Sequence, residues 1–395
     1  MKLIVSHYGM LDGGDANGFT RNINLFSELV NFGYDINFIT TQKKGFKFPY
    51  HKEYRSGVKI IAFPEIFPAR FRKGGIAPLS TILKLLYVTF TKADVVYSDA
   101  GHRPNSGLPC LIHRLFYNSI YISDWWEHYS RGGIYDDLPL INQYTIGAFD
   151  NFSEIRNRKS ADGCITISQA LKKRALENQI EDSRILVLNA GADTNKIPYH
   201  IVNSQKNKYN IEEATFVVSI IGINENEITN NGAILKAIRS LNDSGKKVML
   251  LTTGNLDNKI IENSLIANSW KHFEWVPYEE FSEVISCADI FSLIQINNKR
   301  NNSRFPNKFG DYISAGRPII TNAVGDLKFY SNNYPNFFYV VGESDEEVLS
   351  SLEKAYSDWL INKIDYESIR ELAINNSWIK RADNLNEFIK KICNN

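Results

Sequence analysis

The stretch SRFPNKFGDYISAGRPIITNAVGD, residues 303 to 326, decides the fold of the second half of this chain. Pro306 suits the first turn of a helix, Gly316 suits the left-handed residue that follows a helix, and Pro318 prevents the helix from resuming. The apolar run RPIITNA, 317 to 323, then predicts a buried strand. The stretch therefore predicts a short helix, a tight turn and a strand in direct succession.

Two charged residues stand on this predicted helix. Lys308 and Asp311 are three residues apart, so both project from one face near the helix N-terminus, where free N–H groups favour an anion. An ammonium group, a carboxylate and a helix end together predict a binding site for a phosphorylated, hydroxyl-bearing ligand. The alternative is that the two side chains pair with each other on an exposed face, which is worth only tenths of a kcal/mol.

Strand-like and helix-like runs alternate on both sides of this stretch. In the first half the predicted strands are KLIVSHY, YDINFITT, VKIIAF, DVVYSDA, SIYISDWW and GCITIS, with helices at 79–90, 107–117 and 168–178. In the second half they are TFVVSIIG, KKVMLLTTG, HFEWVP, DIFSLIQ and RPIITNA, with helices at 230–242, 279–287 and 307–315. This order predicts an α/β fold of two doubly wound, Rossmann-like domains joined near 189–198, with ligands at the carboxyl ends of the strands and a cleft between the domains.

Length and composition agree with two globular domains. The chain has 395 residues, of which 43% are hydrophobic and 23% charged. A net charge of +1 excludes the strongly basic class of nucleic-acid binders. The N-terminal apolar run is too short for a secretory signal, and Lys84 interrupts the longest apolar run, so we expect a cytoplasmic protein.

Basic residues gather between residues 43 and 73. This segment holds nine Lys and Arg against two acidic residues, and the amphipathic run ILKLLYVTF follows it. Such a combination predicts peripheral contact of 43–90 with an anionic membrane surface. The alternative is a solvated loop over a core helix.

The order of motifs resembles that of the GT-B glycosyltransferases, and among them the retaining enzymes of glycosyltransferase family 4. The resemblance covers nearly the whole chain: GGDANGFTRNINLFSELVNFGYDINFIT, ADGCITISQALKKRA, ILVLNAGAD, VPYEEFSEVISCADIFSLIQ and FPNKFGDYISAGRPIITNAVGD follow one another in the family's order. It implies an acceptor-binding domain at 1–196, a donor-binding domain at 197–373 and a C-terminal helix, 374–395, that returns to the first domain.

The resemblance also implies roles for individual residues. Lys308 would lie near the donor's diphosphate, and Asp311 would accept hydrogen bonds from the ribose hydroxyls. The remaining donor-binding positions implied are Gly13, Gly14, Gly222, Gly254, Val276, Pro277 and Arg304. The donor would be a UDP- or GDP-sugar, used as a substrate without a cofactor or metal.

The chain departs from the family pattern at two places. Ser303 stands where family members usually carry an acidic residue, and the loop GINENEITNNG, 222–232, lacks the usual Arg and Lys. The diphosphate charge would then fall to Lys308, Arg304 and backbone N–H groups, or to Lys299 and Arg300 moving in.

Candidate groups for the chemistry follow a first-half strand. SDWWEHYSRGG puts Asp124, Glu127, His128 and Arg131 on a predicted loop, where Asp124 or Glu127 would orient the acceptor hydroxyl and His128 would lie near the sugar. Alternatively, the two tryptophans cap the core and the charges face water. Asp99 and His102, at a neighbouring strand end, are a second candidate pair.

Three functions fit these residues. The first is a retaining glycosyltransferase that moves a hexose-type sugar to a glycan acceptor, which we expect to be lipid-linked, in the synthesis of a bacterial surface polysaccharide or glycoconjugate. The second is a GT-B sugar-nucleotide epimerase. The third is a catalytically silent GT-B subunit that stabilises an active partner, an alternative favoured by the cation-free loop.

Overall fold

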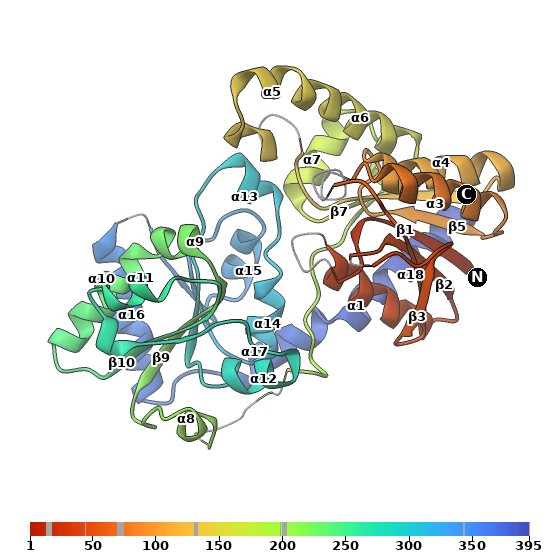
Figure 1. The fold of residues 1–395 in the computed structure, drawn as a ribbon. Coiled ribbons are helices and arrows are strands. Elements are labelled where there is room, and N and C mark those ends of the chain that lie inside the picture. The colour runs from red at the N-terminus through yellow and green to blue at the C-terminus, as the bar shows by residue number, and fades with distance from the viewer. Residues whose placement is uncertain are drawn as a thin grey trace. The chain divides into compact units, whose positions relative to one another are not determined.

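A computed structural model describes residues 1–12, 18–43, 45–68, 75–129, 133–197, 199, 204–342 and 344–394. The chain divides into two compact units (Figure 1). Unit 1 comprises Met1–Gly191, Asn302–Phe305 and Trp378–Asn395, and unit 2 comprises Ala192–Asn301 and Pro306–Ser377. The predicted domain boundaries fall near two of these breaks, but the sequence did not indicate that residues 302–305 belong with unit 1.

Unit 1 is built on an eight-stranded sheet in the order β3-β4-β2-β1-β5-β6-β7-β8. Its strands are β1 (Lys2–Met10), β2 (Asp35–Thr41), β3 (His51–Arg55), β4 (Val58–Phe63), β5 (Val95–Ser98), β6 (Ile120–Trp125), β7 (Gly163–Thr166) and β8 (Ile185–Val187). Its helices are α1 (Phe19–Val30), α3 (Pro78–Thr89), α4 (Pro104–Tyr117), α5 (Leu140–Tyr144), α6 (Ile146–Ser160), α7 (Gln169–Glu177) and α18 (Trp378–Asn394), with the 3₁₀ turns η2 (Ile134–Asp137) and η3 (Asp182–Arg184). All neighbouring strands are parallel except β3, which pairs antiparallel with β4 within the basic segment; a solvated loop was our alternative reading of this segment.

Both faces of this sheet are covered by apolar helix faces. On one face, Val88 of α3 and Cys110 of α4 join a buried cluster with Ile4, Ile39 and Ile61 of the strands. A second layer is formed by α1 and α18, which pack together although they lie near opposite ends of the sequence (Figure 1). The prediction that the C-terminal helix returns to the first domain is therefore confirmed.

Unit 2 holds a six-stranded parallel sheet in the order β11-β10-β9-β12-β13-β14. Its strands are β9 (Phe216–Ile223), β10 (Val248–Gly254), β11 (Trp270–Phe273), β12 (Ile290–Leu293), β13 (Ile319–Thr321) and β14 (Phe338–Val340). Its helices are α8 (Ser204–Lys208), α9 (Glu225–Asn230), α10 (Gly232–Asp243), α11 (Asn258–Glu262), α12 (Tyr278–Ile285), α14 (Lys308–Ser314), α15 (Leu327–Asn333), α16 (Asp345–Leu360) and α17 (Tyr366–Asn375), with η4 (Ala267–Ser269); α13 (Lys299–Ser303) runs across the break into unit 1. Two parallel-rich α/β sheets confirm the predicted fold class.

Residues 303–326 fold as their Pro and Gly residues predict. A turn at Pro306 leads into α14, Gly316 has a positive φ of 68° just after it, and β13 begins after Pro318. A side chain at Gly316 would also meet Tyr199, so backbone conformation and space both require glycine there.

Candidate active site

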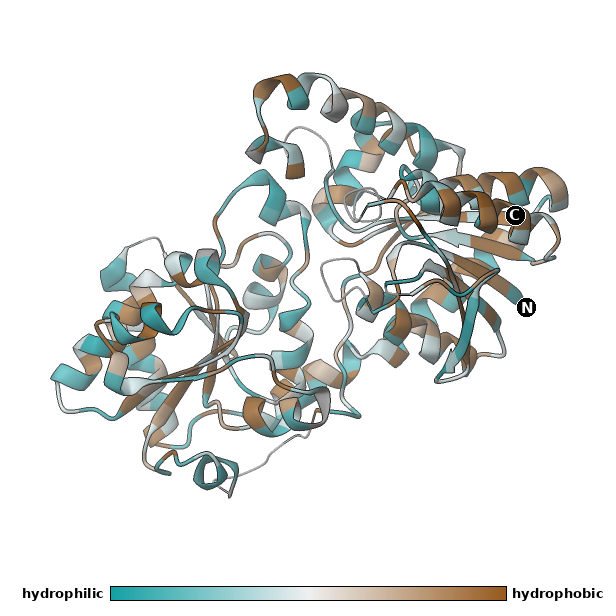
Figure 2. Cartoon of the chain, viewed as in Figure 1, coloured by the Kyte–Doolittle hydropathy of each residue, from teal (hydrophilic) through white to brown (hydrophobic). Residues whose placement is uncertain are grey.

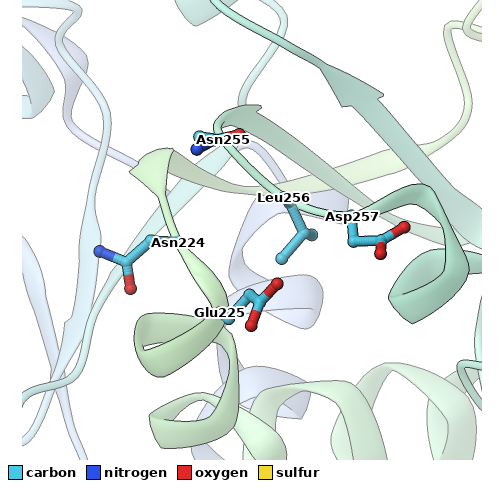
Figure 3. A pocket seen from close by; sticks show the side chains of 5 residues that line it. All are labelled: Asn224, Glu225, Asn255, Leu256 and Asp257. Carbon is cyan, nitrogen blue, oxygen red and sulfur yellow. The ribbon is translucent and has the colours of Figure 1, made fainter.

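A polar cavity of about 350 Å³ lies in unit 2 where β9 and β10 end. Its lining comes from two places, the start of α9 and the turn between β10 and α11: Asn224, Glu225, Asn255, Leu256 and Asp257 (Figure 3). Carboxyl ends of parallel strands are where such sheets bind ligands. The two carboxylates can accept hydrogen bonds from hydroxyl or amide groups and repel phosphate, whereas the two amides can both donate and accept.

Two predicted glycines shape the backbone at these strand ends. Gly222 has φ 63°, and a side chain there would lie 3.7 Å from Cε of Lys308. Gly254 has φ 133°, and its Cβ would come within 2.3 Å of the carbonyl oxygen of Ile223. Only glycine fits at Gly254, which lets β9 and β10 run close together beside the cavity.

Lys308 points back from α14 to the end of β9. Its Nζ donates to both carboxylate oxygens of Glu227, each at 3.0 Å, and to the carbonyl of Gly222 at 3.3 Å. Glu227 stands in the first turn of α9, where the side chain of Asn224 accepts its backbone N–H. The predicted phosphate lysine is thus held by a carboxylate that comes from the cation-free loop.

The other predicted donor residues lie around the same edge of the sheet. Asp311 is half-buried on α14, one turn after Lys308. Val276 is half-buried and Pro277 exposed in the segment that follows β11. Next to them stands Trp275, whose side chain is 82% exposed. An exposed indole at a strand end is a surface on which a planar base can stack.

Asp124 lies inside unit 1 and not on a loop. It is the fifth residue of β6 and fully buried, and it accepts from Nη1 of Arg21 at 2.5 Å and from the hydroxyl of Tyr97 at 2.6 Å. Burial raises the pKa of Tyr97 well above its usual value, so the hydroxyl stays protonated as a donor. The predicted loop position of Asp124 is wrong, and its contacts are those of a carboxylate that positions its neighbours.

Glu127 follows β6 and is almost completely buried. It forms an ion pair with Arg304, whose segment Asn302–Phe305 belongs to unit 1; the hydroxyl of Ser168 donates to the carbonyl of Ser303 in the same segment at 2.7 Å. Arg304 was predicted on the donor side, yet in the structure it contacts the predicted acceptor residue. His128, next in sequence, is half-buried.

Asp99 and His102, the second candidate pair, lie in different environments. Asp99 is fully buried and accepts from the N–H of Tyr8 at 2.9 Å, from Asn22 at 3.0 Å and from Ser106 at 3.0 Å, besides its contact with His7. His102 is also buried, but within the described residues neither ring nitrogen has a hydrogen-bond partner; its ring packs on Tyr129 at 4.2 Å between centroids. Burial lowers the pKa of His102 well below its usual value, so its imidazole is neutral.

Some predicted residues lie outside the described part of the chain. These are Gly13, Gly14 and Arg131, together with Arg70, Arg72 and Lys73 of the basic segment. Within the described residues, no three His, Cys, Asp or Glu side chains are grouped so that they could hold a metal ion. Among the described helices, none is both long and apolar enough to cross a membrane.

No protein-family model and no curated protein matches this chain. Solved structures do match it over nearly its whole length. Sucrose-phosphate synthase from Thermosynechococcus elongatus is similar with a TM-score of 0.74 and 13% identity, over 99% of this chain and 98% of that chain. WaaG, a glycosyltransferase involved in lipopolysaccharide biosynthesis, is similar with a TM-score of 0.70 and 14% identity, over 98% of each chain.

HepE from Anabaena, solved in complex with UDP, is similar with a TM-score of 0.70 and 11% identity, over 98% of this chain and 99% of that chain. At such identities the likeness shows the fold. The chain has the expected GT-B fold, which it shares with these proteins.

Sequence reasoning missed Glu227 and Trp275. Glu227 is 81 residues from Lys308, and no local pattern signals a contact over that distance. A signal for Trp275 was available, because FEWVP places an aromatic residue just beyond an apolar run and next to the predicted Val276 and Pro277.

Proposed function

We propose that this protein is a retaining glycosyltransferase that transfers a hexose-type sugar from a nucleotide-sugar donor, a UDP-sugar in the first instance. The observation that carries the proposal is the assembly of Lys308, Gly222 and Gly254 at the ends of β9 and β10, beside the cavity. The structures of this fold with UDP or UDP-glucose bound support that choice of donor.

The contact with Glu227 does not prevent this role of Lys308. The two side chains are 27% and 38% exposed, and an ion pair that is partly open to water contributes about 0–1 kcal/mol. A charge-assisted contact to a departing diphosphate is worth about 3 kcal/mol. Exchange of Glu227 for the diphosphate is therefore favourable, and donor binding breaks the Lys308–Glu227 pair.

On the acceptor side we propose that Glu127 and His128 contact the acceptor hydroxyl. Asp124 would position them through its contact with Arg21 and its place in β6. The acceptor we propose is a lipid-linked glycan of a bacterial surface polysaccharide. Exposed apolar surface close to these residues supports this choice of acceptor. The turn η2 follows β6, and the N–H of its first residue, Ile134, donates to the carbonyl of His128 at 2.9 Å. Helix α5, which comes next, exposes Leu140 and Ile141. We propose that transfer needs no metal, because Lys308 and backbone N–H groups would hold the diphosphate.

The test is release of nucleoside diphosphate from a panel of UDP- and GDP-hexoses. Slow release, with retention of the anomeric configuration on an added acceptor, is the expected result. Lys308→Ala should lower the rate about a hundredfold or more, while Lys354→Ala, at an exposed lysine of α16, should not. Glu227→Gln should tighten UDP binding up to about fivefold, because it removes the competing carboxylate.

A silent GT-B subunit is the second candidate, and Glu227 is the observation that favours it. If no sugar nucleotide is hydrolysed or bound, and Glu227→Gln does not restore binding, the Lys308–Glu227 pair is a permanent structural contact. Interconversion of sugar nucleotides without release would instead indicate an epimerase.

A further inference from the structure

Helices α3 and α4 expose large apolar side chains along their outer sides. On α3 and its C-cap, Ile82, Leu86 and Phe90 follow one another at intervals of four residues and are 55%, 53% and 83% exposed. On α4, the matching side chains are Leu108, Leu115 and Phe116, at 43%, 80% and 63%. We call these six residues the apolar face; α3 and α4 pack side by side, and Figure 2 shows both mostly in brown.

Charge is nearly absent from these two helices. Their only Lys, Arg, Asp or Glu residues are Lys84 and Arg114. Lys84 is fully buried with its Nζ on the carbonyls of His7 and Asn105, and Arg114 is paired with Asp162 at 2.7 Å. An ordinary surface helix shows a charged outer face to water, so this pair of helices is built for a less polar environment.

Lysine and aromatic side chains line part of the edge of the apolar face, where the exposed Asp94 also lies. Lys92 is exposed just beyond Phe90. On the β3 side, the ring of Tyr50 lies 6.4 Å from that of Tyr87 on α3, which brings the segment around Lys47 and Lys52 against this helix. Lys52 is exposed and sits over the ring of Tyr54.

We infer that the apolar face docks on an anionic membrane surface. Aliphatic and Phe side chains would enter the region between head groups and acyl chains, while the lysines at the edge would contact anionic head groups. Basic charge around an uncharged apolar centre is complementary to such a surface. The inference goes beyond the basic segment predicted from sequence, because α4 supplies half of the face, and it does not depend on glycosyl transfer.

Vesicle co-sedimentation tests it with the full chain. We expect binding to phosphatidylglycerol-containing vesicles, at least tenfold weaker binding to phosphatidylcholine vesicles, and at least a tenfold loss in Phe90→Ser/Leu115→Ser. The matched control is Phe329→Ser/Ile361→Ser, which removes two side chains of unit 2 that are 61% and 70% exposed and should bind like the unmodified protein.

A second measurement keeps the test valid if the double variant fails to fold. An environment-sensitive fluorophore is attached to Leu115→Cys or, as the control, to Ile361→Cys. Both variants also carry Cys393→Ser, because Cys393 is the exposed native thiol. The fluorophore's emission should shift to the blue on anionic vesicles at position 115 and not at position 361. Failure of the protein to bind either vesicle, equal binding by Phe90→Ser/Leu115→Ser, or no shift at position 115 overturns the inference. So does a dimer in sedimentation velocity that this double variant dissociates, because the face would then bind a second copy.

Discussion

Burial changes the acid–base behaviour of Lys84. Its ammonium group is fully buried, and its hydrogen bonds go to two backbone carbonyls, of His7 at 2.7 Å and Asn105 at 3.1 Å. Burial lowers the pKa of Lys84 to about 7, although the nearby Asp99 carboxylate partly opposes the shift. The residue ties α3 to β1 and α4 at the cost of a charge held away from water.

The stability of unit 1 should therefore rise with pH above neutrality. In the unfolded chain the pKa of Lys84 returns to about 10.4, so between pH 7 and 10 the unfolded state binds one proton more than the folded state. The free energy of unfolding then increases by up to about 1.4 kcal/mol per pH unit. Urea titrations at pH 7, 8 and 9 should show this slope in the protein and in Lys92→Met but not in Lys84→Met; equal slopes in all three would contradict the burial effect.

Local chemistry explains which residues the sequence could identify. Lys308 and Asp311 were recognisable because Pro306, Gly316 and Pro318 fix a short helix around them. The burial of Asp124 was not, since it depends on Arg21 and Tyr97, which are 103 and 27 residues away along the chain. The pairing of Lys308 with Glu227 is hidden for the same reason.

At the scale of elements, one buried aromatic side chain links α14 to both β12 and β9. Tyr312 is fully buried, stacks on Phe291 of β12 at 4.0 Å between centroids, and accepts the N–H of Ile221 on β9 at 3.2 Å. Burial holds the pKa of Tyr312 far above its usual value, so the hydroxyl is neutral. The side chain sets the position of α14 against β9 and hence of Lys308 against Gly222.

Tyr312→Phe should loosen this attachment. The buried N–H of Ile221 loses its partner, which costs about 1–3 kcal/mol of stability in unit 2. We expect a lower midpoint in urea and a several-fold higher KM for the donor with a smaller change in kcat, since Lys308 is displaced in ground and transition states alike. The control is Tyr356→Phe on α16; if the two variants behave alike, the hydroxyl of Tyr312 does not position α14.

Strong local signals also explain which elements were predicted. Apolar runs with Gly or Pro at their ends gave β1, β9 and α14 nearly to the residue. The missed elements β3, β8 and β14 are three to five residues long, and their pairing with neighbours defines them more than their composition does. The α5–α6 hairpin was missed because its apolar residues are exposed, which blurs a helical period.

At the scale of the whole molecule, α18 is a structural part of unit 1. Leu385 and Ile389 are fully buried, Phe388 packs where Gly163 of β7 leaves room, and the hydroxyl of Tyr34 donates to Asn386 at 3.3 Å. The chain enters unit 2 at Ala192 and leaves it for α18 after Ser377. These two points lie side by side, because Ala192 and Ser377 form a β-bridge.

Leu385→Ala should accordingly weaken unit 1 and leave unit 2 unchanged. A fully buried leucine truncated to alanine costs about 2–5 kcal/mol. Hydrogen exchange followed by mass spectrometry should show faster exchange in β1 and β5 but not in β9 and β10. Leu360→Ala, at a leucine 56% exposed on unit 2, is the control; faster exchange in both units of Leu385→Ala would mean that they unfold together.

The position of α18 in the sequence also fixes an order of events during translation. All residues of unit 2 leave the ribosome before α18 does, so the unit that is made first is completed last. Until then α1 lacks the helix that packs against it, while some 180 further residues are added. Nascent unit 1 is therefore the stage of synthesis at which a chaperone that binds apolar segments has the most to protect.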